Sequence, residues 1–265
     1  MPGPTQISTT QLARLIGTPD APTIIDVRIP DDFAGHPHLI PTSTRRSHKD
    51  IGVWAKTYIG QRVVVVCQRG HKLSEGAAAL LRTQGIATES LEGGVEAWAA
   101  ASLPMVPAKS LPATNLWVTR HRPKIDRIAC PWLIRRFIDP SARFLFVSPS
   151  EVADVASRFD ATPFDIDGVF WSHRGDTCTF DTLIAEFGLS TPALDRLATV
   201  VRGADTDRHD LAPQAAGLLA ISVGLSRMFR DDLAQLEVGI TLYDALYRWA
   251  RDGFDEGHDW PAGRA

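Results

Sequence analysis

Cysteine is scarce in this sequence. Only three cysteines occur among 265 residues, and no two of them form a CxxC pair. A disulfide framework and a cysteine-rich zinc site are therefore excluded. Any cysteine chemistry must come from single thiols.

Long apolar runs and a strong charge of one sign are also missing. No apolar run approaches the roughly 20 residues that a membrane-spanning helix needs. The opening stretch, MPGPTQISTTQLARLIG, lacks the charged segment and apolar core of a secretory signal. We therefore expect a cytoplasmic protein with no membrane partner. The formal net charge of -3 argues against nucleic-acid binding through a basic surface.

The composition that remains is that of a globular protein. Hydrophobic residues make up 44% of the chain and charged residues 22%, which is enough for two cores of ordinary size. The stretch SLPMVPAKSLPATN, at residues 102–115, holds three prolines and little periodicity. We therefore predict a first domain at residues 1–106, a linker at 107–115 and a second domain at 116–265.

Strand and helix signals alternate in the first hundred residues. TIIDVR and RVVVVC are short β-branched runs, whereas TTQLARLIG and SEGAAALLRTQG show helical spacing. Ser74 is the expected N-cap of the second helix, and Gly85 lies just past its end. This alternation predicts an α/β domain with a central parallel sheet and helices on its faces.

The second half shows a different pattern of secondary-structure signals. NLWVT and RFLFVS are typical of strands, and helical patterns dominate from Thr179 onward. We predict a mostly helical α+β domain. Its last two helices carry long apolar stripes and are expected to form an antiparallel pair, with their aromatic and leucine positions in the core. The same stripes would also suit a partner helix, so a homodimer stays open.

Cys67 ends four consecutive valines and precedes a glycine-containing loop. A buried parallel strand delivers its last residue to the sheet edge where ligand crevices form. The following helix N-terminus favours an anion there and hence the thiolate form, and Arg69, His71 and Lys72 add positive charge. We predict a reactive thiol. The alternative is a small apolar residue that merely ends a strand.

Four motifs in order, IIDVR, DDF, CQRGHKLS and LEGGVEAW, resemble a rhodanese-like domain over about residues 7–106. The resemblance implies that Cys67 carries a sulfane sulfur as a persulfide, with Asp26 and Arg28 supporting the site. It implies a small sulfur donor such as thiosulfate, a thiol or cyanide-like acceptor, and no cofactor. The implied anion-binding loop comprises Gln68, Arg69, Gly70, His71, Lys72, Leu73 and Ser74.

The loop departs from the usual rhodanese pattern at two positions. Lys72 stands where active members usually carry arginine. An ammonium point charge therefore replaces a planar guanidinium that can form two parallel hydrogen bonds, and we expect weaker binding of thiosulfate. Leu73 lengthens the loop by one residue. It also occupies the position where related phosphatases need arginine, so phosphatase activity is not expected. Gly93 and Gly94 are interpreted as structural.

Three stretches of the second half resemble the chromate-resistance family, specifically the ChrB-like C-terminal domain, over about residues 117–252. They are WVTRHRPKIDRIACPWLIRRFIDPSARFLFV, FWSHRGDTCTFDTLIAEFGL and VVRGADTDRHDLAPQAAGLL. The resemblance implies a link to chromate or metal stress, through regulation or through direct handling of the chromate oxyanion.

Two sets of residues in this half are candidates for a site. The first set lies between a predicted strand and a predicted helix and comprises Arg122, Lys124, Asp126 and Arg127. The alternative interpretation of this set is a solvated turn without a functional role. One imidazole and two carboxylates suit a divalent transition metal. With the resemblance, His173, Asp181 and Asp205 form the preferred metal trio, and Cys178 could add a thiolate. The alternative is that His173 is structural.

Three functional hypotheses follow. The first is a rhodanese-type sulfurtransferase linked to chromate or metal-stress resistance. The second is a non-catalytic sensor or regulator that responds to an oxyanion or a metal. The third makes the C-terminal half a metal-dependent enzyme in its own right.

Overall fold

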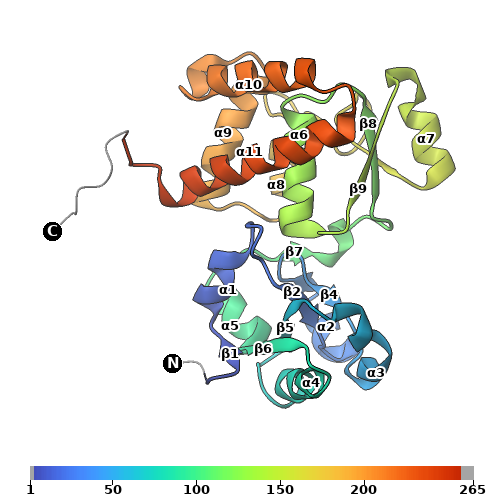
Figure 1. Ribbon diagram of the computed structural model, residues 1–265, viewed down its shortest axis with the longest axis vertical. Coiled ribbons are helices and arrows are strands. Elements are labelled where there is room, and N and C mark those ends of the chain that lie inside the picture. Colours follow the sequence, from blue (N-terminus) through green and yellow to red (C-terminus); the bar gives the residue numbers. More distant parts are fainter. Residues whose placement is uncertain (1–2, 258–265) are drawn as a thin grey trace. The chain divides into compact units, whose positions relative to one another are not determined.

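A computed structural model of the chain describes residues 3–257 (Figure 1). The chain divides into two compact units, and the first boundary falls between Ala113 and Thr114. Two short pieces, Leu133–Ala142 and Glu186–Leu189, group with the first unit. The outermost parts of the two predicted domains, residues 1–2 and 258–265, lie outside the described residues.

The first unit is built on a five-stranded sheet in which every paired strand is parallel. The strand order is β1-β6-β5-β2-β4. The predicted central parallel sheet is therefore confirmed. Strand β5 lies in the middle, and its four valines are fully buried, as a strand covered on both faces requires. The strands are β1 (Gln6–Ile7), β2 (Thr23–Asp26), β4 (Thr44–Arg45), β5 (Arg62–Val66) and β6 (Ala87–Leu91).

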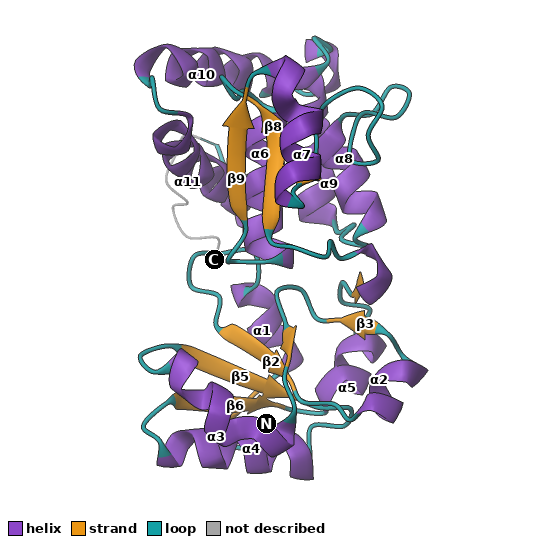
Figure 2. Ribbon diagram, turned by 90° about the vertical axis from the view of Figure 1, so that its right-hand side faces the viewer, coloured by secondary structure: helices purple, strands orange, loops and turns teal. Residues whose placement is uncertain are grey.

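Helices cover both faces of this sheet. Figure 2 shows α3 and α4 on one side of β5 and β6 and α1 on the other. Val63 and Val65 pack in one cluster with Ala77, Ala78 and Leu81 of α4. The helices are α1 (Thr9–Leu15), α2 (Pro30–Gly35), α3 (Ile51–Trp54), α4 (Lys72–Thr83) and α5 (Gly94–Ala100), and a small antiparallel pair joins β3 (His38–Leu39) to β7 (Val106–Pro107).

Helix α4 begins two residues earlier than Ser74, so the predicted N-cap is wrong. His71 occupies the N-cap position, and Ser74 lies fully buried in the first turn. The physical reason is that the Ser74 hydroxyl turns inward, toward Cys67, which follows β5, instead of capping a backbone amide. The predicted end is confirmed, because Gly85 follows the last turn with φ +77°.

The second unit carries a smaller parallel sheet and many helices. Strand β8 (Leu116–Arg120) lies between β9 (Arg143–Val147) and β10 (Thr162–Pro163). The predicted mostly helical α+β architecture is confirmed. Its helices are α6 (Asp126–Leu133), α7 (Val152–Phe159), α8 (Thr179–Glu186), α9 (Pro192–Asp205), α10 (Ala215–Met228) and α11 (Asp232–Asp252). A π-helical turn at Ile134–Ile138 continues α6 and belongs to the piece that groups with the first unit.

The last two helices differ in what they bury. Helix α11 buries Leu236, Ile240, Tyr243 and Tyr247, as expected for core. Helix α10 instead buries Leu218 together with two serines, Ser222 and Ser226. Its larger apolar residues Ile221, Val223 and Met228 are exposed, whereas its leucines are buried or half-buried. The expectation for leucine positions is wrong at Leu233 in the first turn of α11, which is exposed.

We find no helix among residues 3–257 with the length and apolar character that crossing a membrane requires.

Candidate functional site

Cys67 lies directly after β5, at the carboxyl edge of the parallel sheet. Its side chain is only 5% exposed, yet it reaches a cavity of about 530 Å³. Ile29 and Asp32, from the region of α2, line the cavity from outside the predicted loop. The full lining is Ile29, Asp32, Cys67, Gln68, Arg69, His71, Lys72 and Leu73.

Two glycines allow the loop after Cys67 to fold tightly against the start of α5. Gly70 has φ +70°, and a Cβ there would lie 2.6 Å from the backbone nitrogen of Gly94. Gly94 has φ +59°, and a Cβ there would collide with the carbonyl oxygen of Cys67. The backbone N–H of Val95 donates to that same carbonyl at 3.0 Å. The interpretation of Gly94 as structural agrees with these contacts.

The backbone amides of the loop are left available. Within the described part of the chain, the N–H groups of residues 69–73 have no protein acceptor. They include the first two residues of α4, whose N–H groups are unpaired in any helix. Unpaired amides at a helix N-terminus favour an anion. The cavity beside Cys67 is therefore suited to negative charge.

Ser74 contacts the cysteine directly. The Ser74 Oγ lies 3.1 Å from the Cys67 Sγ and 3.2 Å from the carbonyl oxygen of His71. A thiol at Cys67 would donate to the serine oxygen, while the serine hydroxyl donates to His71. A thiolate would instead accept the serine proton after a rotation of the hydroxyl. The sequence placed Ser74 in an anion loop and missed this contact, which only the buried first turn of α4 creates.

The positive charge predicted around the loop is partly neutralised. Arg69 forms an exposed ion pair with Glu96, 3.3 Å between Nε and Oε1. His71 and Lys72 are exposed and line the cavity, and Asp32 adds one negative charge to the opposite side. The cavity therefore owes its preference for anions chiefly to backbone amides and Lys72.

Asp26 and Arg28 form a buried pair beside the site. Their closest atoms, Arg28 Nη2 and Asp26 Oδ2, lie 2.6 Å apart, and neither side chain is more than 1% exposed. Arg28 also donates to the carbonyl oxygens of His36 and His38 at 3.0 and 2.7 Å. The pair therefore fastens the segment after α2 to the end of β2. A supporting role in the chemistry of Cys67 stays a prediction.

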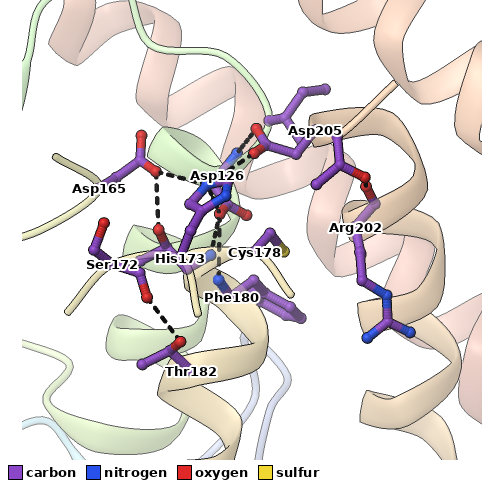
Figure 3. A network of polar contacts seen from close by, with 12 residues as sticks. Asp126, Asp165, Ser172, His173, Cys178, Phe180, Thr182, Arg202 and Asp205 are labelled. Atoms are coloured by element: carbon purple, nitrogen blue, oxygen red, sulfur yellow. Dashed lines mark hydrogen bonds and ion pairs between the residues drawn. The ribbon is translucent and has the colours of Figure 1, made fainter. Parts of the chain in front are cut away.

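A second cluster lies in the C-terminal unit, where Asp126, His173 and Asp205 meet (Figure 3). His173 Nε2 lies 3.1 Å from Asp205 Oδ2 and 3.5 Å from Asp126 Oδ2. It also lies 3.4 Å from Asp165 Oδ1. Asp126 is fully buried, whereas 40% of the His173 side chain is exposed. The cluster therefore opens to solvent on the histidine side.

Separate elements supply these side chains. Asp126 is the first residue of α6, and Asp205 is the last residue of α9. Asp165 follows β10 with φ +52°, and His173 lies in the segment before α8. The first turn of α8 holds Asp126 in place, because the N–H groups of Thr179 and Phe180 donate to its Oδ2.

Asp165 is held by cations. Its Oδ2 lies 3.3 Å from Arg127 Nε and 3.4 Å from Arg120 Nη2. The Thr179 hydroxyl donates to its Oδ1 at 2.9 Å. Since both arginines contact Asp165, the negative charge of this carboxylate is already balanced.

The crowded carboxylates shift one another's proton affinity. Burial, together with the negative charges of Asp205 and Asp165, raises the pKa of Asp126 well above its usual range. Burial works in the same direction at Asp165. There, however, hydrogen bonds from His173 and Thr179 and the charges of Arg127 and Arg120 hold the pKa below its ordinary value. Hydrogen bonds to Asp165 and Asp205 raise the pKa of His173 to about 10.

The structure departs from the predicted metal trio at Asp181. The carboxylate of Asp181 accepts from Arg202 Nη1 at 3.0 Å and from the backbone N–H of Cys178 at 3.0 Å. Among the described residues, the third group beside His173 and Asp205 is Asp126. The physical reason is that Asp181, one turn into α8, caps its own helix and pairs with α9.

The four residues predicted to form a site between a strand and a helix also fall into two groups. Asp126 and Arg127 reach the cluster, but Arg122 does not. The Arg122 guanidinium donates to the carbonyl oxygen of Ser226 at 2.8 Å, and its backbone N–H donates to Asp232. Lys124 contributes a carbonyl oxygen to the turn that starts α6. Arg122 therefore joins the segment between β8 and α6 to the later helices, whereas Lys124 belongs to the turn that starts α6.

The other two cysteines are buried thiols. Burial, with the negative charge of Asp126 nearby, raises the pKa of Cys130 and of Cys178. The Cys178 thiol donates to Asp181 Oδ2 at 3.3 Å. A thiolate contribution from Cys178 to a metal site is therefore not supported.

Sequence reasoning missed Asp165 and failed to associate Asp126 with His173. Asp165 follows a strand of only two residues, and the pattern TPFDIDG gives a weak strand signal. The available clue was position, because Arg120 ends one strand and Asp165 follows another, and the two strands are parallel neighbours in one sheet.

Two family models match this chain. A model of the ChrB C-terminal domain matches residues 117–250, and a model of the rhodanese-like domain matches residues 8–101. The curated protein ChrB of Cupriavidus metallidurans is 41% identical over 133 residues, which are 49% of this chain and 39% of that protein. The matched part is thus well under two thirds of the relative's own length.

Solved structures resemble the first unit. A rhodanese-related protein from Thermoplasma volcanium is 24% identical, with a TM-score of 0.34, over 38% of this chain and 96% of the other. A thiosulfate sulfurtransferase from Pseudomonas aeruginosa is 27% identical, with a TM-score of 0.34, over 42% of this chain and 21% of the other.

Proposed function

This chain belongs to the ChrB C-terminal domain family and carries a rhodanese-like domain ahead of it, and on that premise we propose that its first unit is a sulfurtransferase. Cys67 is the proposed sulfur carrier. The observation that carries the proposal is a cysteine at a parallel strand end, facing a cavity of about 530 Å³ beside unpaired amides.

The proposed reaction has two steps. In the first, the Cys67 thiolate attacks the outer sulfur of a small donor such as thiosulfate. A new S–S bond forms, the donor's S–S bond breaks, and sulfite leaves with the electron pair. In the second, a thiol or cyanide attacks the outer sulfur of the persulfide and regenerates the thiolate.

The surrounding residues would assist in separate ways. The amides of residues 69–73 stabilise the negative charge of the donor and of the persulfide. Lys72 attracts the anionic donor as a point charge, with less directional grip than arginine would give. Ser74 donates its hydroxyl to the thiolate form of Cys67. No cofactor is needed for either step.

The proposal extends to chromate or metal-stress resistance, as the family resemblance implies. In this proposal, the persulfide on Cys67 would serve as a source of sulfur during chromate or metal stress. The cytoplasmic location expected from the sequence belongs to the same proposal.

The experiment uses the full chain incubated with thiosulfate and then cyanide. We expect thiocyanate release and, before cyanide is added, a mass increase of one sulfur on the peptide that contains Cys67. Cys67→Ser should abolish both signals, with a rate loss of about 10³-fold or more, as for other nucleophiles. Cys130→Ala, at a buried cysteine outside the cavity, is the matched control. No sulfur on Cys67 and no thiocyanate would reject the proposal.

A second candidate function is oxyanion sensing without turnover. The unpaired amides of residues 69–73 and the single point charge of Lys72 favour it, since they suit a tetrahedral dianion as well as a persulfide. Sulfate is a suitable probe because it does not oxidise thiols. Retained sulfate binding in Cys67→Ser, with no thiocyanate from the unaltered chain, would favour the sensor, whereas absent binding would reject it.

A further inference from the structure

The side chains of Asp126, His173 and Asp205 have the spacing of metal ligands. Bonds of about 2.0–2.2 Å to nitrogen and oxygen place neighbouring ligand atoms about 3.0–3.5 Å apart. His173 Nε2 lies 3.1 Å from Asp205 Oδ2 and 3.5 Å from Asp126 Oδ2. All three ligand atoms lie within 4.8 Å of one another, and Asp205, at the end of α9, is 18% exposed.

A buried atom without a partner provides an independent indication. Asp126 is fully buried, and its Oδ1 has no hydrogen-bond partner within the described part of the chain. Buried carboxylate oxygens are normally paired or bound to a metal, because an unpaired one loses its hydration without compensation. A bound cation would supply the missing partner.

The charges around the cluster leave room for a cation. Asp165 is already balanced by Arg120 and Arg127. Asp126 and Asp205, in contrast, have His173 as the cationic group that contacts both. Two carboxylates and a neutral imidazole balance the charge of a divalent ion.

The ligands are also held in position before any ion arrives. The N–H groups at the start of α8 fix Asp126, and the Thr179 hydroxyl fixes Asp165 beside His173. Such outer hydrogen bonds orient ligands and are a regular feature of metal sites.

We propose that Asp126, His173 and Asp205 bind one divalent transition-metal ion, such as Mn²⁺ or Zn²⁺, with Asp165 as a positioning residue. One imidazole with two carboxylates suits this class of ion. The exposed side of His173 leaves coordination positions open for water or for an oxygen-donor ligand. The proposal does not depend on sulfur transfer at Cys67.

The test begins with the full chain stripped of metal by a chelator and then titrated with Mn²⁺, Zn²⁺ or Co²⁺. We expect one ion per chain by elemental analysis, and visible absorption bands from Co²⁺ that report its coordination. His173→Ala and Asp126→Asn should weaken binding by about 100-fold or more. Asp165→Asn should weaken it by about 10–100-fold, as loss of an outer-shell partner does.

Matched variants separate this site from the trio predicted by sequence. Asp181→Asn and the exposed Asp210→Asn should keep the ion and the Co²⁺ spectrum. If Asp126→Asn fails to fold, Asp205→Asn, at a partly exposed helix end, decides the question. Substoichiometric metal, or a Co²⁺ spectrum that His173→Ala and Asp205→Asn leave unchanged, would overturn the proposal. Loss of the ion in Asp181→Asn but not in Asp126→Asn would overturn the ligand assignment.

Discussion

The two units place their candidate sites at the same kind of position and build them from different materials. Cys67 follows β5, Arg120 ends β8 and Asp165 follows β10, so each site lies at the carboxyl edge of a parallel sheet. The first site consists mainly of backbone amides from one short loop. The second consists of side chains brought together from residues 126–205.

This difference determines which changes each site tolerates. A site made of backbone depends on the conformation of a few glycines and is indifferent to many side-chain replacements. A site made of converging carboxylates keeps its backbone when one is replaced, but its charge balance changes at once. Substitutions can therefore test the two modes of construction separately.

The largest expected effect is at Gly94. Gly94→Ala forces an L side chain into a left-handed conformation and against the Cys67 carbonyl. We expect a loss of about 2–5 kcal/mol in the free energy of unfolding, from backbone strain and overpacking together. Chemical denaturation measures it. Gly76→Ala in α4, where a Cβ meets nothing within 4 Å, is the control and should be neutral or stabilising. Equal behaviour of the two variants would contradict a backbone-built site.

Thiol labelling gives the next largest contrast. Cys67 lines a cavity, whereas Cys130 and Cys178 are fully buried with raised pKa values, so both stay protonated at neutral pH. A small alkylating reagent should modify Cys67 at least about 100-fold faster than either, because only the thiolate reacts. Peptide mass spectrometry after timed quenching measures the rates. Comparable rates in the folded chain would contradict the difference between the units.

A smaller effect is expected at Asp126. Its raised pKa means that folding favours the neutral carboxyl, so its contribution to stability falls as pH rises above the usual value of 3.8. Asp126→Asn keeps an acceptor for the Thr179 N–H and removes the charge. We expect the metal-free variant to melt about 2–8 °C higher at pH 8, roughly 1–2 kcal/mol, with the gain fading toward pH 4.

Added metal should reverse the order of these melting temperatures. A ligand that binds only the folded chain stabilises it, and the unaltered chain alone would keep the complete set of ligands. A variant that melts lower than the unaltered chain without metal would instead indicate that Asp126 has a purely structural role.

The smallest expected effect is at Ser74. Ser74→Ala removes the hydroxyl that lies 3.1 Å from the Cys67 sulfur. Loss of one hydrogen bond of about 0.5–1.5 kcal/mol should slow sulfur loading at pH 7 by about 2–12-fold. Thr83→Ala, which removes an exposed hydroxyl bonded within the same helix, serves as the control. An unchanged rate in Ser74→Ala would assign the serine a packing role only.

Some expectations stay predictions. They include the sulfur donor and acceptor, chromate as a ligand, and the homodimer. The exposed Ile221, Val223 and Met228 of α10 show where an apolar stripe was left uncovered in one copy of the chain.

The sequence predicted the elements that local patterns control. The four valines before Cys67 predicted the buried central strand, and the glycine after α4 predicted where that helix ends. The sequence was less successful in predicting the direction in which side chains point. The Ser74 hydroxyl turns toward a sulfur instead of an amide, and α10 turns serines inward, because packing against other elements decides which face is buried.

By itself, the sequence determined the alternation of strands and helices, the position of Cys67 at a strand end and the glycine-dependent loop beside it. These features are contiguous, so a short stretch of residues encodes each of them. Only the tertiary structure decided that Asp126 joins His173 and Asp205 while Asp181 pairs with Arg202. The physical reason is that side chains far apart in the chain meet only after helices α6, α8 and α9 have packed, and the directions of those helices depend on the whole core.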